Sequence, residues 1–251
     1  MYRDYFWLSK EQFERLESHL PSDTRGKPRG DHCRVVSGIV HVLKSGCRWV
    51  DAPSVYGPRK TLYNRFVRWA AKGIWEDISM PWHRGWSAGA GADRLFGGEG
   101  SSLRLGRKRG ELTQAIGRSR GGRTTKIYAL TDRFCRPIAF LLTGGQVADC
   151  TAADTLLDQM PAAVILHGDK GYDSDAVRRK IESKGAAPNV PPKVNRRWKN
   201  CFSPYLYRER NAIERMFGRL KNSRRIATRY DRLAHNLLAA VCLAAIVGYW
   251  L

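Results

Sequence analysis

The stretch AAVILHGDKGY, residues 162–172, contains the clearest strand signal in the chain. Ala163 to Leu166 is a short apolar run, which is typical of a strand buried inside a sheet. The run ends in a polar loop that carries Asp169. Open α/β sheets place their functional groups at the carboxyl ends of such strands. The stretch therefore predicts an α/β fold and makes Asp169 a candidate site residue.

The segments on both sides of this strand favour the same fold class. RTTKIYALTD (123–132) and CRPIAFLLTG (135–144) are apolar runs separated by two residues, which predicts an antiparallel hairpin. Apolar periodicity continues through further helices and a short strand that ends at a pair of prolines. These elements are expected at residues 152–160, 175–184, 187–193, 208–225 and 235–251. Their order predicts a mixed sheet with flanking helices.

Residues 1–78 have the pattern of a small all-helical domain. Apolar stripes predict helices over 7–20, 35–46 and 59–73. The third helix has an apolar side and a polar side that carries Lys60, Tyr63, Asn64, Arg65 and Arg68. A helix, a loop and a basic helix are the elements of a helix-turn-helix reader of the DNA major groove. An ordinary amphipathic helix with a solvated charged face fits the same pattern.

The charge of the chain indicates a polyanionic partner. Lys and Arg number 44 against 23 Asp and Glu, which leaves a formal net charge of +21. Residues 193–232 alone hold 13 basic and 3 acidic residues. Such a field favours binding to nucleic acid, although a solvated basic surface or an RNA-binding protein fits the charge as well. No apolar run has the length of a membrane span, so a cytoplasmic protein is expected.

A second acidic residue lies within the basic segment. Glu214 is four residues after Arg210 and seven before Lys221, so all three share one side of a helix. Tyr207 precedes Arg210 by about one helical turn. A carboxylate among cations is often only an ion-pair partner. Together with Asp169, however, Glu214 supplies the carboxylate oxygens that two-metal phosphoryl chemistry requires.

Several motifs in order resemble the DDE transposases of bacterial insertion sequences, in the insertion-sequence family numbered five. YRERNAIERMFGRLK resembles the signature around the family's catalytic Glu, here Glu214, and GDKGYDSDAVRR resembles the segment with its second catalytic Asp, here Asp169. QAIGRSRGGRTTKIYALTD and TGGQVADCTAA are also similar to the family, as are SKEQFERLESHLP and SGCRWVDAP in the helical part. Together the similar segments cover about 1–78 and 114–251.

The resemblance implies a fold, a reaction and a set of partners. The fold is a ribonuclease-H-like α/β core behind a helical DNA-binding domain. The reaction is cleavage at the ends of a mobile element and strand transfer to target DNA, with Mg²⁺ or a substituting Mn²⁺ held by Asp169 and Glu214. Tyr207, Arg210 and Lys221 would contact DNA. Partners would be the terminal inverted repeats, target DNA and further copies of the chain.

Residues 79–113 depart from the family pattern. Gly fills 8 of these 35 positions, and Val and Ile are absent. The family has its first catalytic Asp at the end of an apolar strand here, and only Asp93 is available. The composition predicts no strand, and we treat 79–113 as a separate segment between the helical domain 1–78 and a catalytic domain 114–251. Two compensating frameshifts in a decayed gene would explain it, as would a family variant with a long Gly-rich loop.

These observations lead to two functional hypotheses. The first is a transposase that binds element ends and catalyses metal-dependent cleavage and strand transfer, as an active or a decayed copy. The alternative is an inactive protein that still recognises DNA ends but lacks the first metal-binding Asp.

Overall fold

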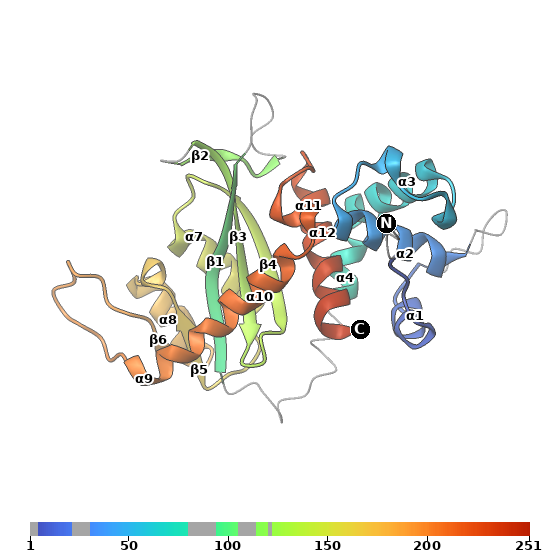
Figure 1. Ribbon diagram of the computed structural model, residues 1–251. Coiled ribbons are helices and arrows are strands. Elements are labelled where there is room, and N and C mark those ends of the chain that lie inside the picture. Colours follow the sequence, from blue (N-terminus) through green and yellow to red (C-terminus); the bar gives the residue numbers. More distant parts are fainter. Residues whose placement is uncertain (1–4, 22–30, 80–93, 105–113, 120–121) are drawn as a thin grey trace. The chain divides into compact units, whose positions relative to one another are not determined.

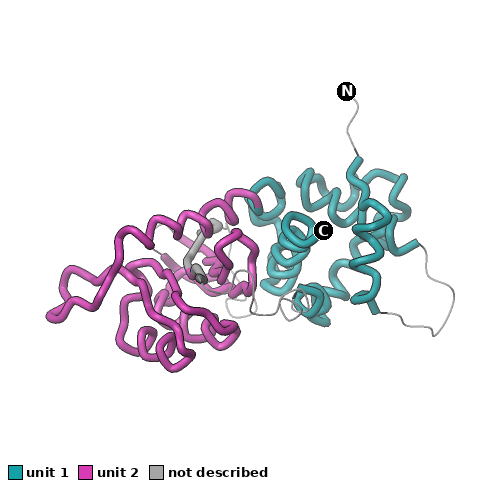
Figure 2. Tube along the Cα trace, turned by 90° about the horizontal axis from the view of Figure 1, so that it is seen from below, with its two compact units in different colours: residues 1–82, 220–251 teal, residues 83–219 magenta. Residues whose placement is uncertain are grey.

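The computed structural model describes residues 5–21, 31–79, 94–104, 114–119 and 122–251. These residues fall into two compact units (Figure 2). We call Met1–Trp82 with Leu220–Leu251 the helical unit, and His83–Arg219 the sheet unit. Asp93, the weak candidate for the first acid, lies outside the described residues. Among the described residues, no helix has the length and apolar character of a membrane span.

The sheet unit contains a mixed six-stranded sheet (Figure 1). The strand order is β2-β3-β1-β5-β6, and β4 also pairs with β3. β1 is parallel to β5 and β5 to β6, whereas β3 runs antiparallel to β1 and β4. The bounds are β1 Arg94–Arg104, β2 Gly117–Ser119, β3 Gly122–Asp132, β4 Pro137–Gly144, β5 Ile165–Gly168 and β6 Ala187–Asn189. The α/β fold with a ribonuclease-H-like mixed sheet and the β3–β4 hairpin are thereby confirmed.

β1 corrects the interpretation of residues 79–113. Its residues pair with β3 on one side and with β5 on the other, so a strand that the composition did not predict lies inside the sheet rather than at its edge. Backbone N–H and C=O groups form these ladders, and they need no apolar side chain. The Gly-rich stretch therefore serves as a strand because its two neighbours satisfy its backbone.

Helices cover both faces of the sheet. α7 (Asp149–Asp158) and α8 (Asp175–Ser183) lie on one face, and α10 (Asn211–Lys221) crosses the other (Figures 1 and 2). The core on the α7 side includes Tyr128, Leu156, Leu166 and Ile181. The remaining short elements of this region are η3 Lys170–Tyr172, α9 Pro204–Tyr207 and η4 Arg208–Arg210.

The helix expected over 208–225 is divided in the structure. α10 ends at Lys221, and a backbone hydrogen bond from Ser223 to the Leu220 carbonyl forms a turn before α11 (Arg224–Ala227).

The helical unit is built from both ends of the chain. α12 (Ala234–Ala245) is apolar around most of its circumference and contacts α2, α3 and α4. Gln12 donates a hydrogen bond to the Leu251 carbonyl at 3.3 Å. The division therefore differs from the expected domains, because residues 220–251 belong with the N-terminal helices rather than with the sheet. The other elements are α1 Lys10–Glu17, α2 His32–Ser45, η1 Trp49–Asp51, η2 Ser54–Tyr56, α3 Arg59–Ala71, α4 Ile74–Ser79 and the π-helical turn η5 Ile246–Trp250.

The connection between α2 and α3 is longer than the expected short loop. It spans residues 46–58 and contains η1, η2 and two prolines, whereas a helix-turn-helix joins its helices by three or four residues. Gly46 ends α2 in the left-handed conformation, with φ of 71°. The orientation of α3 relative to α2 therefore depends on this longer connection.

Candidate active site

Asp169 stands where β5 ends, and the neighbouring strand supports its position. His167 of β5 is fully buried, and its Nδ1 lies 3.0 Å from Asn189 Nδ2 in β6. The Asn189 side chain also accepts a hydrogen bond from the Ser203 N–H at 2.8 Å. Ser203 caps the first turn of α9, which leads to Tyr207. These polar contacts connect β5, which precedes Asp169, to β6 and to the start of α9.

The structure brings together four of the residues expected at the site. Tyr207 donates a hydrogen bond to Asp169 Oδ1 at 3.2 Å, and Arg210 forms an ion pair with the same oxygen. The other guanidinium nitrogen of Arg210 lies 2.6 Å from Glu214 Oε1. One arginine therefore joins the two carboxylates that the sequence singles out. The i,i+4 spacing of Arg210 and Glu214 makes this geometry possible.

Burial and charge act in opposite directions on these groups. Burial disfavours the charged form of Arg210, but its contacts with Asp169, Tyr207 and Glu214 together outweigh burial and raise the Arg210 pKa. Burial also raises the pKa of Tyr207 to about 12, so its hydroxyl remains protonated and donates to Asp169 at neutral pH. The Asp169 and Glu214 side chains retain 37% and 60% exposure. The site is therefore open to solvent while its guanidinium is largely enclosed.

A third position of interest lies on β1. Gly97 is level with Gly168 in the parallel register, so Gly98 follows Gly97 as Asp169 follows Gly168. Gly97 borders a small cavity lined by Leu156 and other core residues on the α7 side. Because successive strand residues face opposite sides, position 98 faces the side of α10. Gly98 thus lies one residue beyond the Gly97–Gly168 pair on β1, as Asp169 does after β5.

These residues do not fit a pair of divalent ions. Among the described residues, no group of three or more His, Cys, Asp and Glu side chains is placed to hold a metal. Both carboxylates already contact Arg210, whose single positive charge offsets part of their negative charge, and position 98 offers no oxygen ligand. Mg²⁺ usually binds one or two carboxylates together with phosphate oxygens and water. The site therefore holds only part of the ligand set that a two-ion centre requires, and a guanidinium lies between its two carboxylates.

Sequence reasoning missed Asp173, which holds the loop after Asp169. Its buried carboxylate forms ion pairs with Arg178 at 2.9 Å and Arg196 at 2.7 Å, and it accepts a hydrogen bond from the Lys193 N–H. Burial alone would raise the Asp173 pKa, but the three donors outweigh it and lower that pKa. The signal available in the sequence was a second Asp four residues after the first in the same loop.

The remaining predicted DNA contacts differ in exposure. Lys221 is exposed at the end of α10, and Lys60, Tyr63, Asn64 and Arg68 are exposed on α3. Arg65 differs from the expectation: it is 8% exposed, and its guanidinium lies 4.9 Å from the Trp69 ring centroid. An arginine can bury its stem along an aromatic surface, and this packing removes Arg65 from the exposed set.

Two family models match the chain. One, described as "Putative transposase of IS4/5 family", matches residues 8–79, and the other, described as "Transposase DDE domain", matches residues 99–247. The second match covers more than half of the chain and begins directly after Gly98.

Curated proteins with similar sequences include two that are named as transposases. A "Putative transposase for insertion sequence element IS6501" from Brucella ovis is 32% identical over 122 residues, which are 48% of this chain and 94% of the relative. A "Putative transposase for insertion sequence element IS402" from Burkholderia cepacia is 31% identical over 121 residues, 44% of this chain and 55% of the relative. An uncharacterized protein from Sinorhizobium fredii is 29% identical over 73 residues, 28% of this chain and 58% of the relative.

Proposed function

Since the chain belongs to the transposase DDE domain family of insertion sequences, whose members transfer phosphoryl groups on DNA, we propose that it acts at the ends of a mobile element. In this proposal the helical unit recognises the terminal inverted repeats. The sheet unit holds a phosphodiester beside Asp169 and Glu214, for cleavage and then strand transfer to target DNA. The contact of Asp169 and Glu214 with one shared Arg210 is the observation that supports this site most strongly.

The residues around the two carboxylates suit a DNA backbone. Arg210 offers a cation for phosphate oxygens, and Tyr207 offers a ring and a protonated hydroxyl. Lys221, exposed at the end of α10, is proposed as a further contact with the DNA backbone. Arginine presents a planar fork that matches phosphate geometry. When phosphate enters, it competes with Asp169 and Glu214 for Arg210. Binding of the DNA backbone and release of the carboxylates are then coupled.

DDE transposase domains use divalent metal ions. We propose Mg²⁺, with Mn²⁺ as a substitute, because hard carboxylate oxygens prefer such ions. As it stands, the chain supplies two carboxylates and no third ligand at position 98.

A second candidate function follows from that geometry. The chain binds element ends but cuts them weakly or not at all, because the strand position beside Asp169 is Gly98. The guanidinium between Asp169 and Glu214 favours this second candidate, since it offsets part of the negative charge that would attract an ion.

One pair of assays separates the two candidates. Gel-shift titrations on the inverted repeats that flank the gene measure end binding, with scrambled repeats as the control. Cleavage of the same DNA is measured with Mg²⁺ and with Mn²⁺. Binding with cleavage that Asp169→Asn abolishes supports the active transposase. Binding without cleavage supports the end-binding protein, and equal affinity for both DNAs contradicts both proposals.

Assembly and location are part of the proposal. Transposition brings two element ends together, so we expect two or more copies of the chain on DNA, in the bacterial cytoplasm at the nucleoid. Light scattering of the protein with and without end DNA measures the assembly. Complexes that contain one copy of the chain and one DNA end at all concentrations would contradict it.

A further inference from the structure

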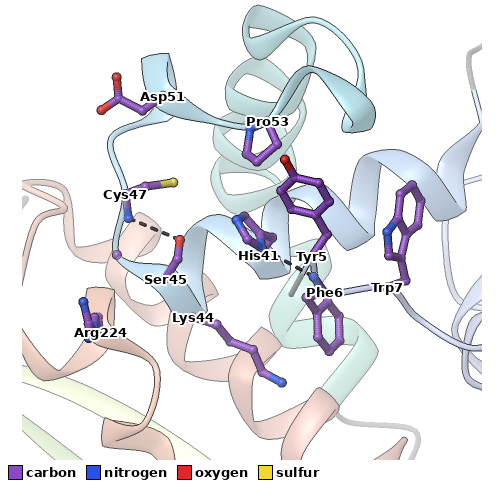
Figure 3. A pocket seen from close by; sticks show the side chains of 11 residues that line it. Tyr5, Phe6, Trp7, His41, Lys44, Ser45, Cys47, Asp51, Pro53 and Arg224 are labelled. Atoms are coloured by element: carbon purple, nitrogen blue, oxygen red, sulfur yellow. Dashed lines mark hydrogen bonds between the residues drawn. The ribbon is translucent and has the colours of Figure 1, made fainter. Parts of the chain in front are cut away.

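The helical unit contains a large hollow that the proposed chemistry does not use (Figure 3). Its volume is about 840 Å³, within the range of pockets that hold small organic ligands. Three segments line it: the N-terminal stretch from Tyr5 to Trp7, the end of α2 with the connection after it, and Arg224 of α11. All of these belong to one compact unit.

Aromatic rings form one wall of the hollow. Tyr5 is 50% exposed and Trp7 is 44% exposed, and their ring centroids lie 6.1 Å and 5.0 Å from that of the fully buried Tyr56. The segment that carries them is anchored, because Tyr56 donates a hydrogen bond to the Phe6 carbonyl at 2.7 Å. Leu8 N–H donates to the Ser37 hydroxyl at 3.1 Å. Two exposed rings are thus held ready for a flat ligand.

Tight packing below the wall explains why it keeps its shape. A Cβ at Gly38 of α2 would lie 2.6 Å from Tyr56 Cβ, so only glycine lets Tyr56 approach the helix this closely. Tyr56 then lies against His41, with ring centroids 5.3 Å apart. A preformed wall loses little conformational freedom when a ligand binds.

Positive charge forms the rest of the lining. Within the described residues, neither Lys44 nor Arg224 forms an ion pair with a carboxylate. Asp51 also lines the hollow, but Arg48 holds its two oxygens at 2.7 Å and 3.1 Å. Desolvation lowers the Lys44 pKa, and a bound anion would reverse this effect. The carboxyl end of α2 contributes roughly half a negative charge, less than the two cations.

We propose that this hollow binds one unpaired nucleotide of single-stranded DNA. The base packs against Tyr5 and Trp7, and its phosphate lies near Lys44 and Arg224. In the view of Figure 3, Lys44 lies between Arg224 and the two rings. Stacking on aromatic side chains tolerates every base, and the cations attract the backbone. The choice of DNA as the polyanion rests on the proposed function, whereas the choice of an unpaired nucleotide rests on the hollow.

The test compares short duplexes that differ only at one end. One has a thymidine overhang, one has an abasic overhang of the same charge, and one is blunt. Fluorescence anisotropy with the full chain measures the affinity for each. Stacking of one base predicts that the wild-type chain prefers the thymidine overhang by about 5- to 100-fold. Trp7→Ala should remove this preference, and Trp198→Ala, an exposed aromatic of the sheet unit, should retain it.

Charge variants test the phosphate contact independently. Lys44→Gln and Arg224→Gln should each reduce the slope of log affinity against log salt for the overhang by about 0.7. Arg179→Gln, an exposed arginine on α8, is the matched control and should leave the slope unchanged. If Trp7→Ala fails to fold by circular dichroism, Tyr5→Ala carries the base test, and the exposed Lys44 and Arg224 variants remain informative.

The outcomes separate this proposal from the proposed function. A base preference that survives both Trp7→Ala and Tyr5→Ala overturns the hollow as a nucleotide site. An acidic peptide that competes with the overhang, while thymidine and abasic overhangs bind equally, assigns it to a protein partner instead. Specific binding to blunt terminal repeats without any overhang preference supports the proposed function and contradicts the nucleotide site. Overhang preference without recognition of the repeats supports the nucleotide site and contradicts the proposed function.

Discussion

Arg210 determines the electrostatics of the Asp169 site, because its two nitrogens contact both carboxylates. Arg210→Gln should therefore raise the affinity for Mn²⁺ by at least about tenfold, since two uncompensated carboxylates attract a cation strongly. Calorimetric titration of the DNA-free chain with Mn²⁺ measures the change. Arg215→Gln removes an exposed cation next to Glu214 without breaking the bridge and serves as the control. Equal Mn²⁺ affinities in the two variants would mean that the bridge does not compete with metal.

A substitution at position 98 tests the same site by adding a carboxylate instead of removing a cation. Gly98→Asp places a carboxylate beside Asp169 on the side of α10, so we expect tighter Mn²⁺ binding and a rise in melting temperature when Mn²⁺ is added. Gly97→Asp is the matched control, because position 97 borders the apolar cavity on the α7 side. A buried, unpaired carboxylate there should destabilise the fold by several kcal/mol without metal binding. Metal binding by neither variant would contradict the register of β1.

Part of the candidate site could be predicted from the sequence alone. Asp169 was predicted from the strand before it, and the partners Arg210 and Glu214 from helical spacing. The guanidinium bridge was not predictable, because spacing places Arg210 and Glu214 on one helix side but does not tell where the end of β5 meets that helix. Arg65 was misplaced for a related reason: its sequence spacing does not show that Trp69 covers it.

At the scale of elements, the loop after β5 depends on Asp173. Because its pKa is lowered in the folded state, Asp173 contributes stability above its unfolded pKa of about 3.9 and loses it as pH falls through the folded value. Asp173→Asn should cost about 3 kcal/mol or more at pH 7, since Arg178 remains buried without its partner. Urea denaturation from pH 7 to pH 3 should show a smaller loss of stability in the variant. Parallel losses would exclude Asp173 as the titrating group.

Helix α3 is the element that we expect to read the element ends. Asn64→Ala should reduce discrimination between cognate and scrambled repeats by about 1–3 kcal/mol, as expected for the loss of one bidentate base contact. Arg65→Ala should instead lower stability, because it removes packing over Trp69. Competition gel shifts and thermal melts distinguish the two effects. If Asn64→Ala weakens both DNAs equally, α3 contacts only phosphates.

Elements with a regular apolar pattern were predictable, and elements defined by their neighbours were not. The β3–β4 hairpin followed from two apolar runs around Arg133 and Phe134, and it formed as expected. β1 carries Gly97 and Gly98 in a stretch without Val or Ile, so no local preference favoured a strand. Its place inside the sheet comes from pairing with β3 and β5, which are distant in sequence.

For the whole molecule, the main result is a helical unit that is discontinuous in sequence. The apolar pattern of 235–251 predicted a helix but could not identify the surface that it covers. In the structure Val241 and Leu243 of α12 are fully buried in a unit whose core also includes Phe66 of α3 and Trp75 of α4. A domain boundary at residue 78 would therefore separate α12 from the hydrophobic core that it completes.

Truncation tests this arrangement. A fragment of residues 1–82 should not fold stably, because the loss of α12 exposes several apolar side chains worth about 1.5–3 kcal/mol each. Their sum approaches the 5–15 kcal/mol that stabilises a typical domain. Joining residues 1–82 to 220–251 through a flexible linker should restore cooperative thermal unfolding by circular dichroism, and Leu243→Asp in the joined protein should abolish it again. A fragment 1–82 that melts cooperatively at the same temperature as the joined protein would show that α12 contributes little to this core.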